Sequence, residues 1–175
     1  MNARDILHFW FEEIDAKQHF KKDDAFDALI RSRFLAVHRA ACACELYAWR
    51  ASAQGRLAEI IVLDQFSRNI FRGDERAFAN DSLALALAQE AIRCGDDLQI
   101  PSAQRSFLYM PFMHSESIKV HEVALTLFEK DALDFERRHK RVIERFGRYP
   151  HRNVILGRAS SPEERAFLKT PGSSF

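Results

Sequence analysis

Residues 54–73 read QGRLAEIIVLDQFSRNIFRG, and this stretch decides the fold class. Its apolar residues recur at three- and four-residue steps, which predicts a long amphipathic helix that begins at Gln54. Gly73 ends the pattern, because glycine favours turns over helix interiors. Stripes with the same spacing occur on both sides of this stretch, and no segment alternates apolar and polar residues as a strand does. The sequence therefore predicts an all-α protein.

Caps and breaks give the boundaries of the other helices. Gly95 and Gly147 are expected to end helices, and Pro111 is expected to break or restart one, since proline has no N–H to donate. The remaining helices are expected to begin after Asn2, at Asp23–Asp24, at Ala77, at Ser102, near Val120, at Phe135 and after Ser161. The core is expected to contain Phe9, Phe34, Phe66, Phe107, Phe128 and Phe146.

The length predicts one domain. A chain of 175 residues and 20.3 kDa is expected to form a single all-helical domain over 1–175. Residues 147–160 contain few periodic apolar positions and predict an ordered loop, and Ser161-Pro162-Glu163-Glu164 predicts a short terminal helix. About seven or eight helices in antiparallel pairs are typical of stacked helical repeats, although the sequence shows no clean repeat. We therefore expect a degenerate tetratricopeptide-repeat-like α-α superhelix.

The charges are balanced in total and uneven along the chain. A net charge of +1 excludes a strongly basic nucleic-acid binder, so no nucleic-acid partner is expected. Residues 137–175 hold ten Lys or Arg and three Asp or Glu, a net +7, whereas residues 61–136 carry a net −6. Either the basic tail packs across the acidic middle, or it forms a basic cleft for a carboxylate or phosphate ligand.

Several features favour a cytoplasmic location. No apolar run reaches the 18 or so residues of a membrane helix, and the charged N-terminus does not resemble a signal peptide, so no membrane partner is expected. Cys42, Cys44 and Cys94 are three, and we expect all of them to be reduced thiols. A single Cys-x-Cys pair is weak as a zinc signal.

A first polar cluster continues the apolar stripe of the 54–73 helix. Asp64 and Arg68 follow Leu57 and Ile61 on one face, so both are expected to be buried. A buried charge needs a partner, which leaves two interpretations: an Asp64–Arg68 pair that fixes helix packing, or the wall of a polar pocket. The neighbouring ligand-binding candidates are Gln65, Asn69 and Arg72.

Two further polar clusters follow Pro111 and Phe146. His114 and Glu116 are candidates for an acid and a base, and His151 is a third catalytic candidate. His121 lies about 10 Å from His114 if one helix carries both, too far to share a metal ion, so no metal site is expected. His114 could equally be a cap or a hydrogen-bonded core residue. The ligand-binding candidates in the second of these clusters are Arg148, Arg152, Asn153 and Arg158.

The three clusters together resemble the DUF924 family of uncharacterised bacterial proteins. The segments that carry the resemblance are DQFSRNIFRG (64–73), FLYMPFMHSE (107–116), RFGRYPHRN (145–153) and LGR (156–158), with Pro162-Glu163-Glu164 and Phe167-Leu168. The resemblance implies an all-helical fold similar to tetratricopeptide-repeat proteins and implies no reaction. Three residues depart from the expected pattern: Ser67 replaces proline, Gln104 replaces glutamate and His121 replaces glutamine.

Three hypotheses for function follow. In the first, the three clusters converge on one pocket that binds a small anionic ligand, where arginines hold the anion and His114 or His151 moves a proton. In the second, a helical-repeat scaffold binds a peptide or a partner helix. In the third, the polar clusters only tie the C-terminal loop to the helical core. The cofactor, the oligomeric state and the occurrence of catalysis are not determined by the sequence.

Overall fold

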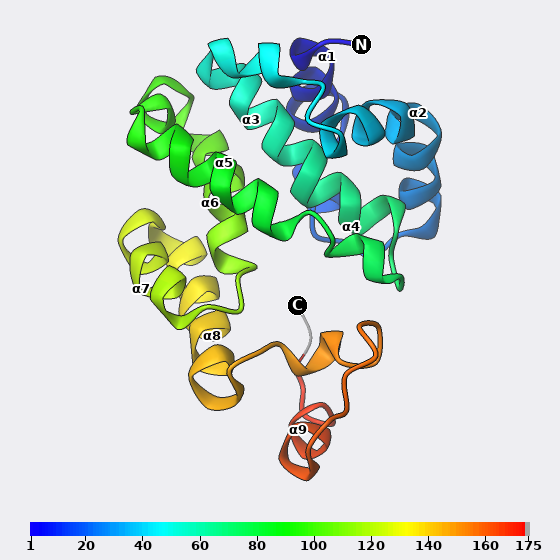
Figure 1. Cartoon of the computed structure of the whole chain (residues 1–175), viewed down its shortest axis with the longest axis vertical. Helices are drawn as coiled ribbons and strands as arrows, with labels where there is room; N and C mark the ends of the chain where they lie inside the picture. Colours follow the sequence, from blue (N-terminus) through cyan, green and yellow to red (C-terminus); the bar gives the residue numbers. More distant parts are fainter. Residues whose placement is uncertain (174–175) are drawn as a thin grey trace. The chain divides into compact units, whose positions relative to one another are not determined.

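The computed structural model describes residues 1–173, and in that range every regular element is a helix (Figure 1). The chain folds into two compact units. Unit 1 comprises Met1–Arg72 and Arg76–Pro111, and unit 2 comprises Gly73–Glu75 and Phe112–Phe175. The all-α prediction is confirmed for the described residues. The expectation of one domain over 1–175 stays a prediction.

The first two α-helices of unit 1 start after side-chain caps, as predicted. Asn2 accepts from the Asp5 N–H while the Asp5 side chain accepts from the Asn2 N–H, which closes a capping box. Asp23 accepts hydrogen bonds from the first turn of the next long helix. The elements of this part are α1 (Ala3–His8), the π-helical turn η1 (Phe9–Glu13), the 3₁₀ turn η2 (Ala16–Gln18) and α2 (Asp24–Cys42).

The 54–73 stretch is helical but is not one regular α-helix. It begins at Ala53, because the Ser52 hydroxyl accepts from the Gly55 N–H and caps it. A π-helical turn then interrupts it, a feature that often marks functional positions in helices. The elements here are the 3₁₀ turn η3 (Tyr47–Ala51), α3 (Ala53–Ile61), the π turn η4 (Val62–Phe66) and α4 (Ser67–Ile70).

Two predicted boundaries in the rest of unit 1 are wrong. The helix expected from Ala77 begins at Asp81, whose carboxylate favours a first-turn position. Pro111 does not break its helix, because it lies in the last turn and removes only one hydrogen bond there. The elements are the 3₁₀ turns η5 (Glu75–Ala77) and η6 (Asp96–Gln99) and the helices α5 (Asp81–Arg93) and α6 (Ser102–Met113), and α6 runs into unit 2.

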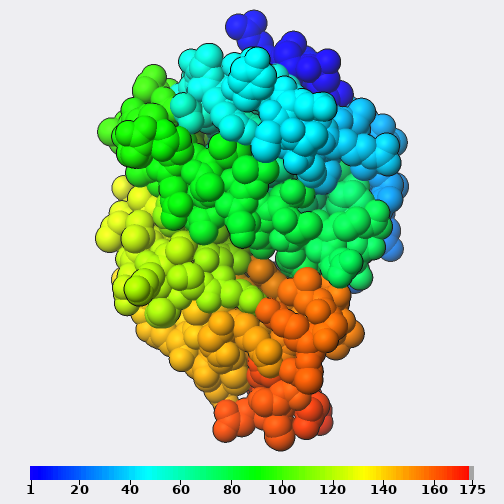
Figure 2. Space-filling view, viewed as in Figure 1, coloured from blue at the N-terminus to red at the C-terminus, as the bar shows by residue number. Residues whose placement is uncertain are grey.

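Unit 2 contains α7 (Ile118–Leu127), α8 (Lys130–Phe146), the 3₁₀ turn η7 (Pro150–Arg152) and α9 (Pro162–Phe167). The helix expected at Phe135 begins earlier, at Lys130, and it ends as predicted where Gly147 takes a left-handed conformation (φ 67°). The predicted capping box of α9 is present. In Figure 2 the yellow side chains of α7 meet the gold side chains of α8, in agreement with the contacts between the two helices.

The core of unit 1 is aromatic. The Phe9 and Phe34 rings lie 4.6 Å apart, and the Phe34 and Phe66 rings lie 4.8 Å apart. Of the predicted core phenylalanines, all are buried except Phe146, which is partly buried against Phe167. Aromatic burial of this size is a large part of the stability of a small helical unit.

The buried face of α7 is not wholly apolar. Val123 of α7 is about half exposed, whereas His121 and Ala124 are buried. The buried face of α7 therefore contains a histidine. None of the helices formed by residues 1–173 is both long enough and apolar enough to cross a membrane.

Candidate functional site

The first polar cluster lies in unit 1 around the π turn η4. The side chain of Asp64 is fully buried, and Arg68 reaches it with Nη1 at 3.2 Å from Oδ1 and 2.9 Å from the main-chain oxygen. Arg68 also pairs with Asp81 at the start of α5, at 3.1 Å. The internal Asp64–Arg68 pair of the first interpretation is therefore present.

The remaining residues of this cluster connect α4 to its neighbours. Gln65 donates to Asp64 Oδ2 at 2.6 Å and to the Met110 sulfur at 3.3 Å. Asn69 and Arg72 both donate to the buried carboxylate of Asp27 in α2, at 2.8 Å each. Asp27 was not among the predicted residues, although its place in the first turn of α2 between Phe26 and Ile30 is a signal for a buried carboxylate.

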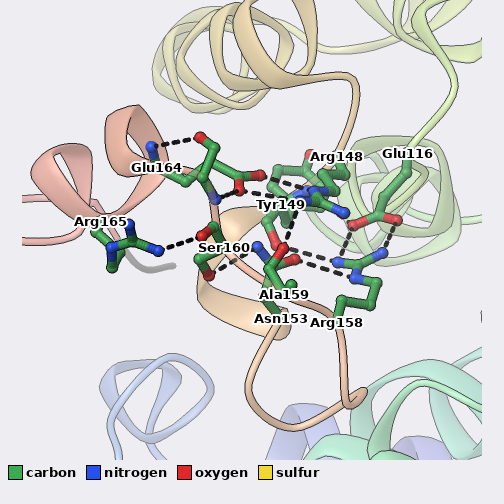
Figure 3. A network of polar contacts seen from close by, with 10 residues as sticks. Glu116, Arg148, Tyr149, Asn153, Arg158, Ala159, Ser160, Glu164 and Arg165 are labelled. Carbon is green, nitrogen blue, oxygen red and sulfur yellow. Dashed lines mark hydrogen bonds and ion pairs between the residues drawn. The ribbon is translucent and has the colours of Figure 1, made fainter.

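In unit 2, Glu116 and Arg158 form a two-point ion pair. The two guanidinium nitrogens lie 2.6 and 2.9 Å from the carboxylate oxygens, and the Tyr149 N–H donates to Glu116 at 2.7 Å (Figure 3). Burial disfavours the charged carboxylate, but Arg158 and the Tyr149 N–H outweigh it and hold the pKa of Glu116 below its usual value. Glu116 is therefore an ionised structural partner and not a proton donor near neutral pH.

Arg148 makes the second two-point pair of this network. It donates to the two carboxylate oxygens of Glu164 at 2.7 and 2.9 Å and to the Ala159 carbonyl at 2.8 Å. The Arg148 hydrogen bonds lower the pKa of Glu164 to about 2. Asn153 lies between the two pairs, where it accepts from Arg158 at 3.0 Å and donates to Ser160 at 3.0 Å (Figure 3). These contacts fix the path of residues 147–160.

The other predicted residues of unit 2 surround Tyr149, which is fully buried. The Arg152 guanidinium lies 4.6 Å from the centre of the Tyr149 ring and donates to the His114 carbonyl at 3.0 Å. The His151 ring lies against the same tyrosine, with 5.6 Å between the ring centres. The Tyr149 hydroxyl donates to the Met113 carbonyl at 2.6 Å.

A buried histidine–glutamate pair, which was not predicted from the sequence, completes this cluster. His121 Nδ1 lies 2.6 Å from Glu136 Oε1, and both side chains are fully buried. His121 Nε2 lies 2.8 Å from the Ser115 carbonyl, which can only accept, so that nitrogen carries a hydrogen. With the ring hydrogen on Nε2, Nδ1 and the Glu136 oxygen would both be acceptors. A second proton must therefore lie between these two atoms. Within the described residues, Glu136 Oε2 has no hydrogen-bond partner.

His139 lies one helical turn after Glu136 and packs edge-on against Tyr149, with 5.8 Å between the ring centres. Burial lowers the pKa of His139 to about 3, and nearby His114, His121 and His151 add to this effect. His139 is therefore neutral near pH 7.

The signal for His121 and Glu136 in the sequence was weak, because each falls on a helix face that also carries exposed residues.

A solvent-open cavity of about 510 Å³ runs along α8. Its lining is one residue of α7 and three turns of α8, namely Leu125, Asp134, Arg137, Arg138, Lys140, Arg141 and Glu144. Arg137 pairs with Asp134, and Lys140 pairs with Glu144. Arg138 and Arg141 form no ion pair with any residue in the described range 1–173. We call this feature the α8 groove. None of its residues was among the predicted site residues.

The predicted site residues thus form one cluster inside each unit. Asp64, Gln65 and Arg68 lie together in unit 1, where Asn69 and Arg72 share Asp27. The unit 2 residues, His114, Glu116, Arg148, His151, Arg152, Asn153 and Arg158, are joined directly or through Tyr149. Convergence of the two clusters on one pocket stays a prediction. Among residues 1–173, no three His, Cys, Asp or Glu side chains are placed to hold a metal ion.

Comparison with known proteins identifies the family of this chain. The sequence matches the family described as "Bacterial protein of unknown function (DUF924)" over residues 6–172. A solved structure of a protein of unknown function from Agrobacterium tumefaciens is similar to this chain, with 41% sequence identity and a TM-score of 0.91, and the match covers 95% of this chain and 96% of that one. A search of curated proteins gave no match. Because the family match covers nearly the whole sequence, the chain belongs to the DUF924 family.

Proposed function

We propose that this protein binds a small anionic ligand, and that the ligand occupies the α8 groove. The observation that carries the proposal is a 510 Å³ cavity with two arginines in its lining, Arg138 and Arg141, that no carboxylate of the described chain neutralises. Cavities of roughly 300–1,000 Å³ are typical of small-molecule sites. The predicted arginines Arg148 and Arg158 are a weaker choice, because each already binds a carboxylate at two points.

The positions of the two arginines suit recognition of a carboxylate or a phosphate. Arg138 and Arg141 are three residues apart on α8, so their side chains leave the helix on the same face. The Arg138 guanidinium lies 5.3 Å from the centre of the exposed Phe135 ring, which limits its freedom before a ligand binds. Arginine forms two parallel hydrogen bonds to carboxylates and phosphates, so two of them supply both charge and orientation.

The proposal also includes an acid–base role for two histidines of unit 2. His114 and His151 remain the candidates for moving a proton, and what supports them is their place beside Tyr149 and Arg152 in the same unit as the groove. Glu116 is a weaker candidate, because Arg158 binds both of its carboxylate oxygens and its pKa is lowered, which makes it a poor base. Catalysis is not required for the binding proposal.

A second candidate is a tetratricopeptide-repeat-like scaffold that binds an acidic peptide. It is supported by the packing of α7 on α8 and by the exposed apolar side chains Val123 and Phe135 on these helices. Residues 134–144 extend over about 15 Å of helix, enough for a short peptide.

Thermal unfolding in the presence of probe anions tests the proposal. Inorganic phosphate, pyrophosphate, small dicarboxylates, nucleotides and a glutamate-rich peptide would be screened separately. A ligand at one hundred times its dissociation constant should add about 2.7 kcal/mol of stability. The double variant R138Q/R141Q should lose this gain, whereas R4Q/R39Q, which removes two exposed arginines of unit 1, should keep it. Stabilisation by the peptide alone would favour the scaffold, and equal losses in both variants would reject the groove.

A further inference from the structure

A third arginine lies on the same face of α8 as the two arginines of the α8 groove. Arg138, Arg141 and Arg145 follow one another at steps of three and four residues, so their side chains leave the helix on one side. We call these three exposed residues the arginine row. The row extends over about 10 Å of the helix axis. Arg145 comes directly after Glu144, the last residue of the groove lining, so the row continues past the end of the groove.

Aromatic rings hold the two ends of the arginine row apart. The Arg138 guanidinium lies 5.3 Å from the centre of the Phe135 ring, one turn earlier on α8. The Arg145 guanidinium lies 4.7 Å from the centre of the Phe146 ring and 5.9 Å from that of Phe167 in α9. Phe135 and Phe146 are separated by about 16 Å along the helix axis. Because cation–π contacts restrict an arginine, the two end guanidinium groups are held toward opposite ends of the row.

The two carboxylates of the groove lining are paired with other basic side chains. Asp134 accepts from Arg137 at 3.0 Å, and Glu144 accepts from Lys140. Over the part of the chain that the structure describes, no carboxylate forms an ion pair with an arginine of the row. The row therefore presents three positive charges that an anion from solution can neutralise.

We infer that the ligand of the α8 groove is a linear anion with at least three phosphate groups, and that Arg145 binds the group at one end of it. This inference rests on the anion-binding function proposed above. A single phosphate is too short to contact Arg138 and Arg145 together while the rings hold them apart, whereas a chain of phosphates can follow the row. Each guanidinium donates two parallel hydrogen bonds to one phosphate group, so the row selects for the number of groups as well as for charge.

Single-stranded nucleic acid fits the arginine row less well than a phosphate chain does. Proteins that bind single strands combine a basic groove with aromatic rings on which the bases stack. Along the row, Arg138 and Arg145 already lie over the rings of Phe135 and Phe146. The row therefore offers contacts to phosphate groups and no ring kept clear for a base.

Isothermal titration calorimetry of the full chain with pyrophosphate and with tripolyphosphate, at one pH, tests the inference. At an ionic strength of about 0.15 M the Debye length is about 8 Å, so charges far from the bound anion contribute little. The unsubstituted protein should bind tripolyphosphate at least about fivefold more tightly than pyrophosphate, as expected for one additional exposed ion pair. Arg145→Gln should reduce this ratio to less than about twofold. The control Arg39→Gln, which removes an exposed arginine of unit 1, should keep the ratio of the unsubstituted protein.

The outcomes separate this inference from the proposed function. If the ratio is the same in Arg145→Gln and in the unsubstituted protein, the inference is wrong, while anion binding in the groove stands. Tighter binding of a single-stranded thymidine oligonucleotide than of tripolyphosphate would overturn it in favour of a nucleic acid. Absence of binding, or binding of both anions that R138Q/R141Q leaves unchanged, would reject the proposed function itself.

Discussion

Arg158 binds Glu116 at two points across forty-two residues of sequence. This pair connects the segment before α7 to the loop after η7, inside unit 2. The pair also explains part of the uneven charge of the chain, because a basic residue of the tail neutralises an acidic residue of the middle. The intramolecular interpretation of the charge pattern therefore holds for this contact.

Arg158→Gln should destabilise the protein by about 1–3 kcal/mol, because it leaves a half-buried carboxylate with one hydrogen bond. Urea unfolding measures this change. The double variant E116Q/R158Q should cost less than the sum of the two single variants, because the two residues are in contact. Additive losses would mean that the ion pair contributes nothing to stability.

Acid should weaken the second pair of unit 2 within a defined pH range. The folded pKa of Glu164 is about 2, below the value of about 4.3 for an unfolded glutamate. The stability from Arg148 is therefore present above about pH 4.3 and is lost as the pH falls toward 2. As the pH falls over this range, the urea midpoint of E164Q should fall less steeply than that of the unsubstituted protein. The exposed control E122Q should show the same pH dependence as the unsubstituted protein.

A separate loss of stability should begin nearer neutral pH. His139 has a folded pKa of about 3, whereas an unfolded histidine titrates near 6.5, so the unfolded chain binds more protons between these values. Stability is complete above about pH 6.5 and declines as the pH falls. His139→Gln should reduce the dependence of the urea midpoint on pH between pH 6.5 and 4.5. The exposed control His8→Gln should leave that dependence unchanged.

The buried His121–Glu136 pair should be sensitive to loss of one partner. Glu136→Ala should lower the free energy of unfolding by about 3–5 kcal/mol, because it leaves buried His121 without the carboxylate that shares its proton. His121→Gln should cost less than Glu136→Ala, since an amide can still donate to the Ser115 carbonyl. Equal losses in the two variants, measured by urea unfolding, would contradict this description of the pair.

The sequence predicted helix positions better than it predicted partners. Caps such as Asn2 and Ser161 act within four residues, so local pattern was enough to place α1 and α9. Pro111 was misjudged because its effect depends on where the helix ends, two residues later. The departure at Ser67 was visible in the sequence, but its bond to His38 was not.

The candidate site illustrates the same limit. Arg148 and Arg158 were predicted to bind a ligand, and the sequence did not show that each binds a carboxylate of the chain, because these carboxylates lie sixteen and forty-two residues away, a spacing that no periodicity encodes. The α8 groove was missed because Arg138 and Arg141 have the pattern of an ordinary solvated helix face. A groove depends on the neighbouring helix, and that arrangement is a tertiary property.

Amide chemical-shift mapping of the ¹⁵N-labelled full chain during titration with pyrophosphate tests the binding proposal most directly. Saturable shifts should appear at Leu125 and over residues 134–144, and the R138Q/R141Q variant should weaken binding at least about tenfold. The same titration of R4Q/R39Q should match the unsubstituted protein. Shifts that do not saturate, or that are centred elsewhere in the chain, would contradict an anion site in the α8 groove.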